Sequence, residues 1–199
     1  MLSNTTVTLV RHPHVDNPRG IYYGQLPGFK LSAEGLQQAQ HVAEHFRGKR
    51  IAAIFSSPRL RARQTAWVIA DALGIKHIHI SKLLDEVHSF FDGHPIQELV
   101  KRNWNVYTGI PPPFEQPNDV LARMQKFLSS IQRQYAGSHV VAVTHGDPIA
   151  FTLLWARGSH IAAGMKPEPY PEPASISTFC FEGVQGNQLP SYARYASTS

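Results

Sequence analysis

Short apolar runs alternate with amphipathic stretches along this chain. The apolar runs are rich in branched residues, and each is only a few residues long, which is typical of buried strands. We predict strands over residues 6–10, 51–55, 77–80, 139–144 and 175–181. The pattern therefore favours a sheet whose strands are spread along the whole sequence.

Apolar residues at helical spacing lie between these runs. Ser32 is a good N-cap for the first such stretch, and Gly74 and Gly137 are typical stops for two later ones. Asp147-Pro148 predicts the N-cap and first turn of a helix that continues through Trp155. The apolar faces of the first three helices consist of Leu36, Ala39, Ala43 and Phe46; Ala62, Ala66, Ile69 and Leu73; and Leu121, Met124, Leu128, Ile131 and Tyr135.

Alternating strands and helices predict an α/β fold. We expect a three-layer sandwich with a mostly parallel central sheet and helices on both faces. The 199 residues suit one domain, residues 1–199. Residues 87–117 show no steady period and include Pro111-Pro112-Pro113, so we expect a small cap or insert over the crevice.

Composition narrows the functional classes. Apolar residues make up 42% and charged residues 17%, which excludes wholesale disorder. The net charge of +5 suits an anionic small molecule, and without a long block of Lys and Arg we expect no nucleic acid partner. Cys180 is the single cysteine, which excludes an intrachain disulfide and a CxxC metal site. No membrane-length apolar run or signal pattern is present, so we expect a cytoplasmic protein without a membrane partner.

Two strand ends carry residues suited to catalysis. Arg11-His12 follows the first strand, and His145-Gly146 follows the strand at 139–144. Ligands of open parallel sheets bind at the carboxyl ends of strands, and Gly146 lets a ligand approach the backbone closely. The helix after the second strand opens with Arg59, Arg61 and Arg63, and Asp85-Glu86 follows the third. Cations, histidines and carboxyls in these places suit phosphoryl chemistry.

At these residues the chain resembles the histidine phosphatase superfamily, which includes phosphoglycerate mutases. The resemblance runs from about Thr6 to Phe181 with four motifs in the family order. They are Arg11-His12-Pro13-His14; Ser56-Ser57-Pro58-Arg59-Leu60-Arg61-Ala62-Arg63-Gln64-Thr65-Ala66; Leu84-Asp85-Glu86 with Asp92-Gly93; and Val143-Thr144-His145-Gly146. Four ordered motifs make a strong match.

The resemblance implies a role for each matching residue. His12 would be the nucleophile that becomes transiently phosphorylated, and Arg11 and Arg61 would bind phosphoryl oxygens. His145 would complete the pocket as a donor or cation, and Glu86 would act as acid and then as base. Arg59 and Arg63 are expected to be solvated or salt-bridged. The implied substrate-binding residues are Asn17, Tyr23, Gly24, Gln25 and Gly146.

Three features depart from the family pattern. Pro13 replaces the usual glycine and removes a backbone N–H, although its carbonyl can still orient His12. His14 replaces a common acidic residue. The segment from Glu86 to Gly93 is about one residue short, which leaves Asp85 as a competitor for the catalytic acid. Phe90, Phe91, Trp104 and Tyr107 are open to a role either in a substrate pocket or in packing.

The sequence favours a metal-independent phosphatase that needs no cofactor and hydrolyses a phosphorylated small molecule through a phosphohistidine. A phosphoglycerate mutase-type transferase is the alternative, although residues 114–119 supply little of the positive charge that a bisphosphate requires. The sequence is also compatible with a homodimer as the oligomeric state.

Two other readings remain. His12-Pro13-His14, with Asp16 and His145, has the spacing of a metal-dependent hydrolase, but Arg11 would repel a divalent cation. A non-catalytic module that binds phosphate is the other reading, and Pro13 keeps it in consideration.

Overall fold

One six-stranded sheet forms the centre of the molecule. The computed structural model describes residues 4–182 and 190–195. The strand order is β3-β2-β4-β1-β5-β6. Strands β1 to β4 are mutually parallel, β5 runs antiparallel to β1, and β6 antiparallel to β5. The strands span Thr5–Arg11 (β1), Ala53–Ser56 (β2), His79–Ile80 (β3), His139–Thr144 (β4), Ile176–Phe181 (β5) and Ser191–Tyr195 (β6).

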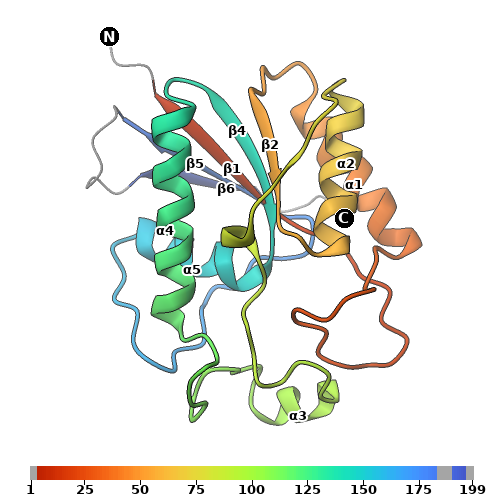
Figure 1. Cartoon of the computed structure of the whole chain (residues 1–199), viewed down its shortest axis with the longest axis vertical. Coiled ribbons are helices and arrows are strands. Elements are labelled where there is room, and N and C mark those ends of the chain that lie inside the picture. Colours follow the sequence, from red (N-terminus) through yellow and green to blue (C-terminus); the bar gives the residue numbers. More distant parts are fainter. Residues whose placement is uncertain (1–3, 183–189, 196–199) are drawn as a thin grey trace.

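Helices cover both faces of this sheet, which confirms the predicted three-layer sandwich. Figure 1 shows α1 and α2 on one side of the strands and α4 and α5 on the other. A short 3₁₀ turn, η1, and a short helix, α3, lie in the connection between α2 and α4. The bounds are Ala33–Phe46 (α1), Leu60–Ala72 (α2), Lys82–Leu84 (η1), Ile96–Lys101 (α3), Pro117–Gln134 (α4) and Gly146–Ala156 (α5).

Alternation along the strands divides the core between the two faces. Successive side chains of a strand point to opposite sides of its sheet. In β1, Val7 and Leu9 pack in the cluster that contains α4 and α5, whereas Val10 packs with α1 and α2. In β4, Val140 and Val141 divide in the same way. Both faces of the central strands are therefore apolar, and the reactive residues lie at their ends.

The predicted cap at 87–117 contains α3 and packs through its own apolar cluster. Val87, Leu99 and Tyr107 from this segment pack with Val120 of α4 and Phe151 of α5. Figure 1 shows α3 beyond the carboxyl ends of the parallel strands. The segment thereby lies over the edge of the sheet where the two catalytic-looking histidines emerge.

Strand β2 is shifted from the predicted 51–55, and β3 covers only the second half of the predicted 77–80. Two further details differ from the sequence prediction. Strand β6 was not predicted, and it extends the sheet by pairing with β5. The N-cap of α5 is His145 rather than Asp147, which lies in the first turn. The strand ends at Thr144, so the next residue already takes the cap position.

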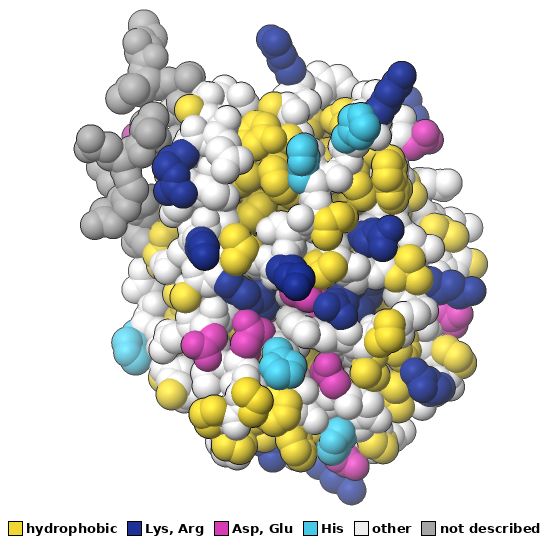
Figure 2. All heavy atoms as spheres, in the orientation of Figure 1, with side chains coloured by type: hydrophobic (Ala, Val, Ile, Leu, Met, Phe, Trp, Pro, Cys, Tyr) yellow, Lys and Arg dark blue, Asp and Glu magenta, His cyan; other side chains and the backbone are white. Residues whose placement is uncertain are grey.

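The surface shows no single dense block of positive charge on the face drawn in Figure 2, where Lys and Arg side chains are interspersed with apolar and acidic ones. Within the described residues, no helix is both long and apolar enough to cross a membrane.

Candidate active site

The ends of β1 and β4 bring the two histidines together. These strands are parallel neighbours, and their register pairs Arg11 with Thr144, the residues just before His12 and His145. The backbone N–H of His12 donates to the carbonyl of Thr144 at 3.1 Å. The two imidazole rings consequently lie 5.1 Å apart, centroid to centroid. Adjacent parallel strands explain why residues 133 positions apart in sequence share one site.

His12 is held as a neutral imidazole with a defined tautomer. Its Nδ1 lies 2.9 Å from the carbonyl oxygen of Pro13, so Nδ1 carries the proton and donates it. Nε2 therefore keeps its lone pair, which accepts a hydrogen bond from Arg61 Nε at 3.1 Å. Burial lowers the pKa of His12 well below its usual value, and the guanidinium groups of Arg61 and Arg11 lower it further. His12 is therefore neutral, with its lone pair at Nε2 shared with Arg61.

Arg61 is the centre of the buried cluster. It is the second residue of α2, its side chain is 0% exposed, and its Nη2 donates to the carbonyl of Gly24 at 2.8 Å. The same Nη2 lies 3.2 Å from Nδ1 of His145, and the guanidinium carbon lies 4.7 Å from the ring centre of Tyr23. Within the described residues, Arg61 Nη1 has no hydrogen-bond partner. A buried cation with an unused donor suits a phosphoryl oxygen.

His145 is fully buried beside this arginine. Its Nε2 lies 2.7 Å from the hydroxyl of Ser57, and because Arg61 donates to Nδ1, the ring proton is on Nε2. Burial lowers the pKa of His145 well below its usual value, with Arg61 and His12 lowering it further. Both histidines are thus neutral beside the buried guanidinium of Arg61.

Glu86 and Asp85 follow η1 but face different surroundings. Arg59 donates to both carboxylate oxygens of Asp85, through Nε at 2.7 Å and Nη2 at 2.6 Å. Glu86 lines the pocket, with Oε2 3.5 Å from Nδ1 of His145 and 3.9 Å from Nη2 of Arg61. The carboxyl of Asp85 is therefore held in an ion pair with Arg59, whereas the carboxyl of Glu86 lies close to His145.

Burial raises the pKa of Glu86 to about 8, and the negative charge of Asp147 contributes to that rise. Asp147 is itself buried, and its carboxylate accepts hydrogen bonds from the hydroxyls of Tyr107 at 2.8 Å and Tyr170 at 3.0 Å. Burial raises the pKa of Asp147 as well, but the two phenol donors lower it. Glu86 has no such donor pair among the described residues, so we assign the charge of this carboxyl pair to Asp147 and the proton to Glu86 at neutral pH.

Arg11 lines the pocket next to His12. Its guanidinium carbon lies 5.1 Å from the ring centre of Tyr170, and Nη1 donates to the carbonyl of Pro171. In the described part of the chain, Arg11 Nε is buried without a hydrogen-bond partner. Gly146 makes room for this arrangement, because a Cβ there would lie 2.2 Å from the hydroxyl oxygen of Tyr170.

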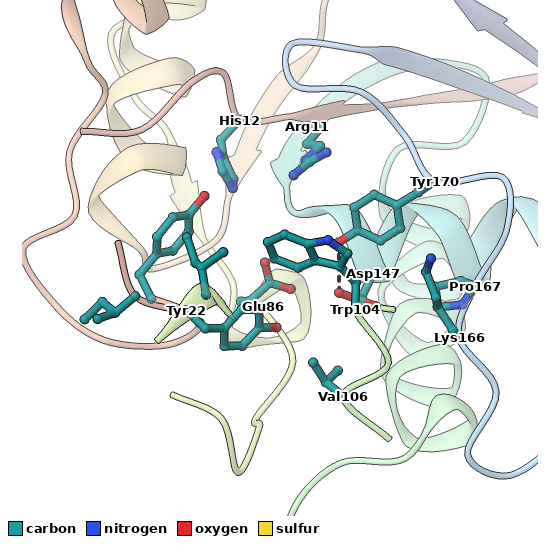
Figure 3. Close-up of a pocket in the computed structure, with 14 residues that line it drawn as sticks. Arg11, His12, Tyr22, Glu86, Trp104, Val106, Asp147, Lys166, Pro167 and Tyr170 are labelled. Carbon is teal, nitrogen blue, oxygen red and sulfur yellow. Dashed lines mark hydrogen bonds between the residues drawn. The ribbon is translucent and has the colours of Figure 1, made fainter. Parts of the chain in front are cut away.

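A pocket of about 410 Å³ opens next to these groups. We call the cluster of His12, Arg61, His145 and Glu86 its inner end. His12 and Glu86 line the pocket, and Arg61 and His145 lie next to them, at 3.1 Å from His12 and 3.5 Å from Glu86 respectively. The outer end consists of Ile21, Ile96, Trp104, Val106 and Pro167. In the view of Figure 3, the indole of Trp104 is drawn between Arg11 and Glu86, and Lys166 and Pro167 are drawn beyond Tyr170 and Asp147. The complete lining is Arg11, His12, Ile21, Tyr22, Tyr23, Gly24, Glu86, Ile96, Trp104, Val106, Asp147, Lys166, Pro167 and Tyr170.

The family model of the histidine phosphatase superfamily (branch 1) matches residues 7–191. The chain belongs to this superfamily. An uncharacterized protein of Mycobacterium tuberculosis is 34% identical over 168 residues, covering 81% of this chain and 83% of that protein. Phosphoserine phosphatase 1 of Hydrogenobacter thermophilus is 29% identical over 150 residues, 71% of each chain.

A solved mycobacterial glucosyl-3-phosphoglycerate phosphatase has the same fold, with a TM-score of 0.77 at 21% identity, and the match covers 98% of this chain and 100% of that one. The superfamily match and the phosphatase relatives show that this protein is an enzyme of the phosphatase or mutase type.

The histidine phosphatase motifs meet in space, but three of the expected substrate-binding residues are not among the described residues that line the pocket. Tyr23 and Gly24 line it. Asn17 donates from its amide to the carbonyl of Ile21 at 2.9 Å and thereby closes its own loop. Gln25 donates to the carbonyl of Glu86 at 2.7 Å and so supports that segment. Gly146 lies against the ring of Tyr170, which itself lines the pocket.

The two substitutions in the first histidine phosphatase motif have different surroundings. Pro13 still supplies the carbonyl that receives the Nδ1 proton of His12. The His14 side chain is 55% exposed and lies 2.9 Å from the hydroxyl of Ser32, at the start of α1. Its replacement of an acidic residue therefore alters the surface beside α1 rather than the pocket lining.

Sequence reasoning missed several pocket residues. Tyr22, Asp147, Lys166 and Tyr170 line the pocket, and Trp104 belongs there rather than to the packing of the cap. Asp147 was interpreted only as a helix cap. The position of Asp147 directly after the fourth motif could have indicated a place in the site. Tyr22, Trp104, Lys166 and Tyr170 lie in irregular segments without a characteristic pattern.

A resident metal does not fit the inner end. Within the described residues, one ligand atom each from His12, Glu86 and His145 lie within 4.8 Å of one another, which is compact enough for a cation. However, the lone pairs of His12 Nε2 and His145 Nδ1 both face the buried guanidinium of Arg61. Its positive charge would repel a metal ion, whereas it attracts an anionic phosphoryl group. His14 lies at α1, so His12-Pro13-His14 does not form a chelating pair.

Proposed function

We propose that this protein is a metal-independent phosphatase that hydrolyses a phosphomonoester of a small molecule through a phosphohistidine at His12. One observation carries the proposal. The Nδ1 proton of His12 is donated to the Pro13 carbonyl while Arg61 faces Nε2, so a neutral nucleophilic nitrogen lies beside an anion-binding guanidinium.

In the first step, Arg61 Nε transfers its hydrogen bond from His12 Nε2 to a phosphoryl oxygen. The freed lone pair of Nε2 attacks phosphorus, and the bond from phosphorus to the ester oxygen breaks. The phosphoryl oxygens are held by the unused donors Arg61 Nη1 and Arg11 Nε. The ring becomes cationic on phosphorylation, and the Pro13 carbonyl stabilises the Nδ1–H of that cation. Because Glu86 is protonated at neutral pH, it donates its proton to the leaving oxygen.

In the second step, the Glu86 carboxylate takes a proton from water. The resulting hydroxide attacks phosphorus, the P–N bond breaks, and inorganic phosphate leaves. His12 Nε2 regains its lone pair and Glu86 its proton, so the cycle closes without a cofactor. His145 and Arg61 remain in place throughout, because both are fully buried.

Trapping the intermediate tests this assignment. Wild-type protein mixed with a radiolabelled aryl phosphate and quenched within milliseconds is expected to retain label that is stable in alkali and lost in acid. His12→Ala is expected to retain none and to lower kcat/KM on the order of 10⁴-fold. His41→Ala, an exposed histidine on α1, is the matched control and should keep both properties.

Undiminished turnover by His12→Ala would refute the phosphohistidine mechanism. The same assay with 3-phosphoglycerate separates the mutase alternative, since label that moves to another hydroxyl of the substrate without phosphate release assigns a transferase. Treatment of the wild type with a chelator should leave the rate unchanged, and a rate lost to chelation and restored by a divalent cation would assign a metal enzyme.

A further inference from the structure

The outer end of the pocket is apolar and aromatic. Ile21, Ile96, Val106 and Pro167 contribute aliphatic surface, and Trp104 contributes an indole. They come from the loop after β1, from the cap and from the segment after α5. In the view of Figure 3, the Trp104 indole is drawn beside Glu86 and below Arg11. Whatever group leaves from the phosphorus must lie against this surface, because the inner end is filled by the phosphoryl group.

Charge in the pocket disfavours a second anion. Asp147 lines the pocket as a carboxylate held by two tyrosine hydroxyls, and no described residue neutralises it through an ion pair. In the part of the chain that the structure describes, the cations that line the pocket are Arg11 and Lys166, and Lys166 Nζ lies 2.7 Å from the carboxylate of Glu168. A carboxylate or second phosphate on the leaving group would therefore meet a buried negative charge and a cation that is already paired.

The position of Trp104 is unusual for so large a side chain. Asn103 and Trp104 have φ angles of 52° and 59°, in the left-handed region that bulky residues rarely adopt. The backbone N–H of Trp104 donates to the carbonyl of Leu99 at 2.7 Å, which fixes this turn at the end of α3. The indole is nevertheless 46% exposed. Strained backbone conformations are frequent at functional sites, and the strained turn here places a half-exposed indole at the pocket.

We infer that the substrate is a phosphomonoester whose leaving alcohol is uncharged and carries a ring or another flat apolar group. This group would stack on Trp104, and the negative charge of Asp147 would disfavour an alcohol that carries an anion. This inference rests on the proposed phosphatase function and specifies its substrate class. Phosphoglycerates and other esters with an anionic alcohol are then poor substrates.

A matched pair of substrates tests the charge rule. 4-Carboxybenzyl phosphate and 4-carbamoylbenzyl phosphate have nearly the same shape and leaving-group acidity but differ by one negative charge. We expect kcat/KM to be at least about tenfold higher for the uncharged amide. Asp147→Asn should reduce this ratio below about threefold, since it removes the opposing charge. Equal rates for both substrates in the wild type, or a preference for the carboxylate, would overturn the inference.

Trp104→Ala tests the stacking surface. We expect a loss of about tenfold in kcat/KM for benzyl phosphate, as for a lost apolar contact, and less than about twofold for methyl phosphate. Trp67→Ala is the matched control, because Trp67 on α2 is also 46% exposed but does not line this pocket. Trp104→Phe should restore most of the lost rate, which a purely structural role at this strained turn would not predict.

The outcomes separate the two levels of the proposal. Phosphate release from none of the esters, or release that survives His12→Ala, would refute the phosphatase function. Release that depends on His12 but is equal for benzyl and methyl phosphate, or indifferent to Trp104, would refute the substrate class alone.

Discussion

The inner and outer ends of the pocket are built in opposite ways. At the inner end, His12, Arg61 and His145 are 2%, 0% and 0% exposed, and regular elements position all three. At the outer end, Trp104 is 46% exposed and follows a short helix in a turn with positive φ angles. The inner end is a fixed polar cluster, whereas the outer end is an apolar surface supplied by connecting segments.

This difference matches what each end must do. The phosphoryl group is the same in every phosphomonoester, so its site can be rigid and preorganised. The alcohol varies from substrate to substrate, and connecting segments change without disturbing the core. Reaction type is therefore expected to depend on the inner end, and substrate choice on the outer end. Substitutions that separate the two properties test this division.

The largest of these effects is expected from Glu86→Gln. Loss of the acid should lower kcat/KM for an alkyl phosphate by about 10²- to 10⁴-fold. The wild-type profile should decline as pH rises through about 8, because Glu86 has a raised pKa and must be protonated to act as acid. His12 has a lowered pKa and stays neutral down to well below 6.5, so it does not set this limb.

A profile measured from pH 5 to 10 checks the assignment of Glu86. The limb near pH 8 should disappear in Glu86→Gln, and it should remain in Asp147→Asn but at lower pH, since a raising charge is removed. An unchanged limb in Glu86→Gln would assign the acid to another group. Glu86→Gln should lower kcat/KM less for an aryl ester with an acidic phenol than for the alkyl ester, because the phenol oxygen needs less protonation to leave.

A smaller effect is expected from Arg59→Met, which breaks the ion pair that holds Asp85 beside Glu86. The two side chains are only 23% and 12% exposed, so the carboxylate left behind is poorly solvated. The free energy of unfolding should fall by about 2 kcal/mol, between the values for surface and fully buried pairs. Urea denaturation measures this change.

The double variant with Asp85→Asn is the control for Arg59→Met. Removing both charges should recover much of the stability, because no unpaired carboxylate remains. Loss of stability equal to or greater than that of the single variant would show that the pair matters by its packing rather than by its charges.

The smallest effect is expected from His14→Glu, which restores the acidic residue common in the family. His14 is 55% exposed and bonds at the start of α1, outside the pocket lining. A surface charge there is screened by solvent, so kcat/KM for benzyl phosphate should change by less than about threefold. A change of tenfold or more would show that the entrance extends as far as α1.

Most of the fold followed from the sequence because its signals are local. Apolar runs, the N-cap Ser32 and the stops at Gly74 and Gly137 predicted the elements of the sandwich, and the structure confirms them. Strand β6 escaped prediction, since pairing with β5 stabilises it more than its own apolar pattern indicates. Asp147 was assigned to the wrong cap position because the end of β4 sets where α5 begins.

The inner end of the site could be anticipated and the outer end could not. The sequence motifs predicted His12, Arg61 and His145, and they left the choice of acid open between Glu86 and Asp85. The structure brings the first three together, and Asp85 forms an ion pair with Arg59 instead. Their proposed roles still require the experiments above. Tyr170 and Lys166 carried no motif, since they reach the pocket from a long connection whose path depends on packing.

The sequence by itself determined the family, the strand-and-helix order and the residues that can perform phosphoryl chemistry, because side-chain type and local periodicity are properties of neighbouring residues. Only the tertiary structure decided which carboxyl faces the histidines, which nitrogen of His12 holds the proton, and that Asp147 and Trp104 border the same cavity. These features depend on distances between segments far apart in the chain, which packing against a common sheet establishes.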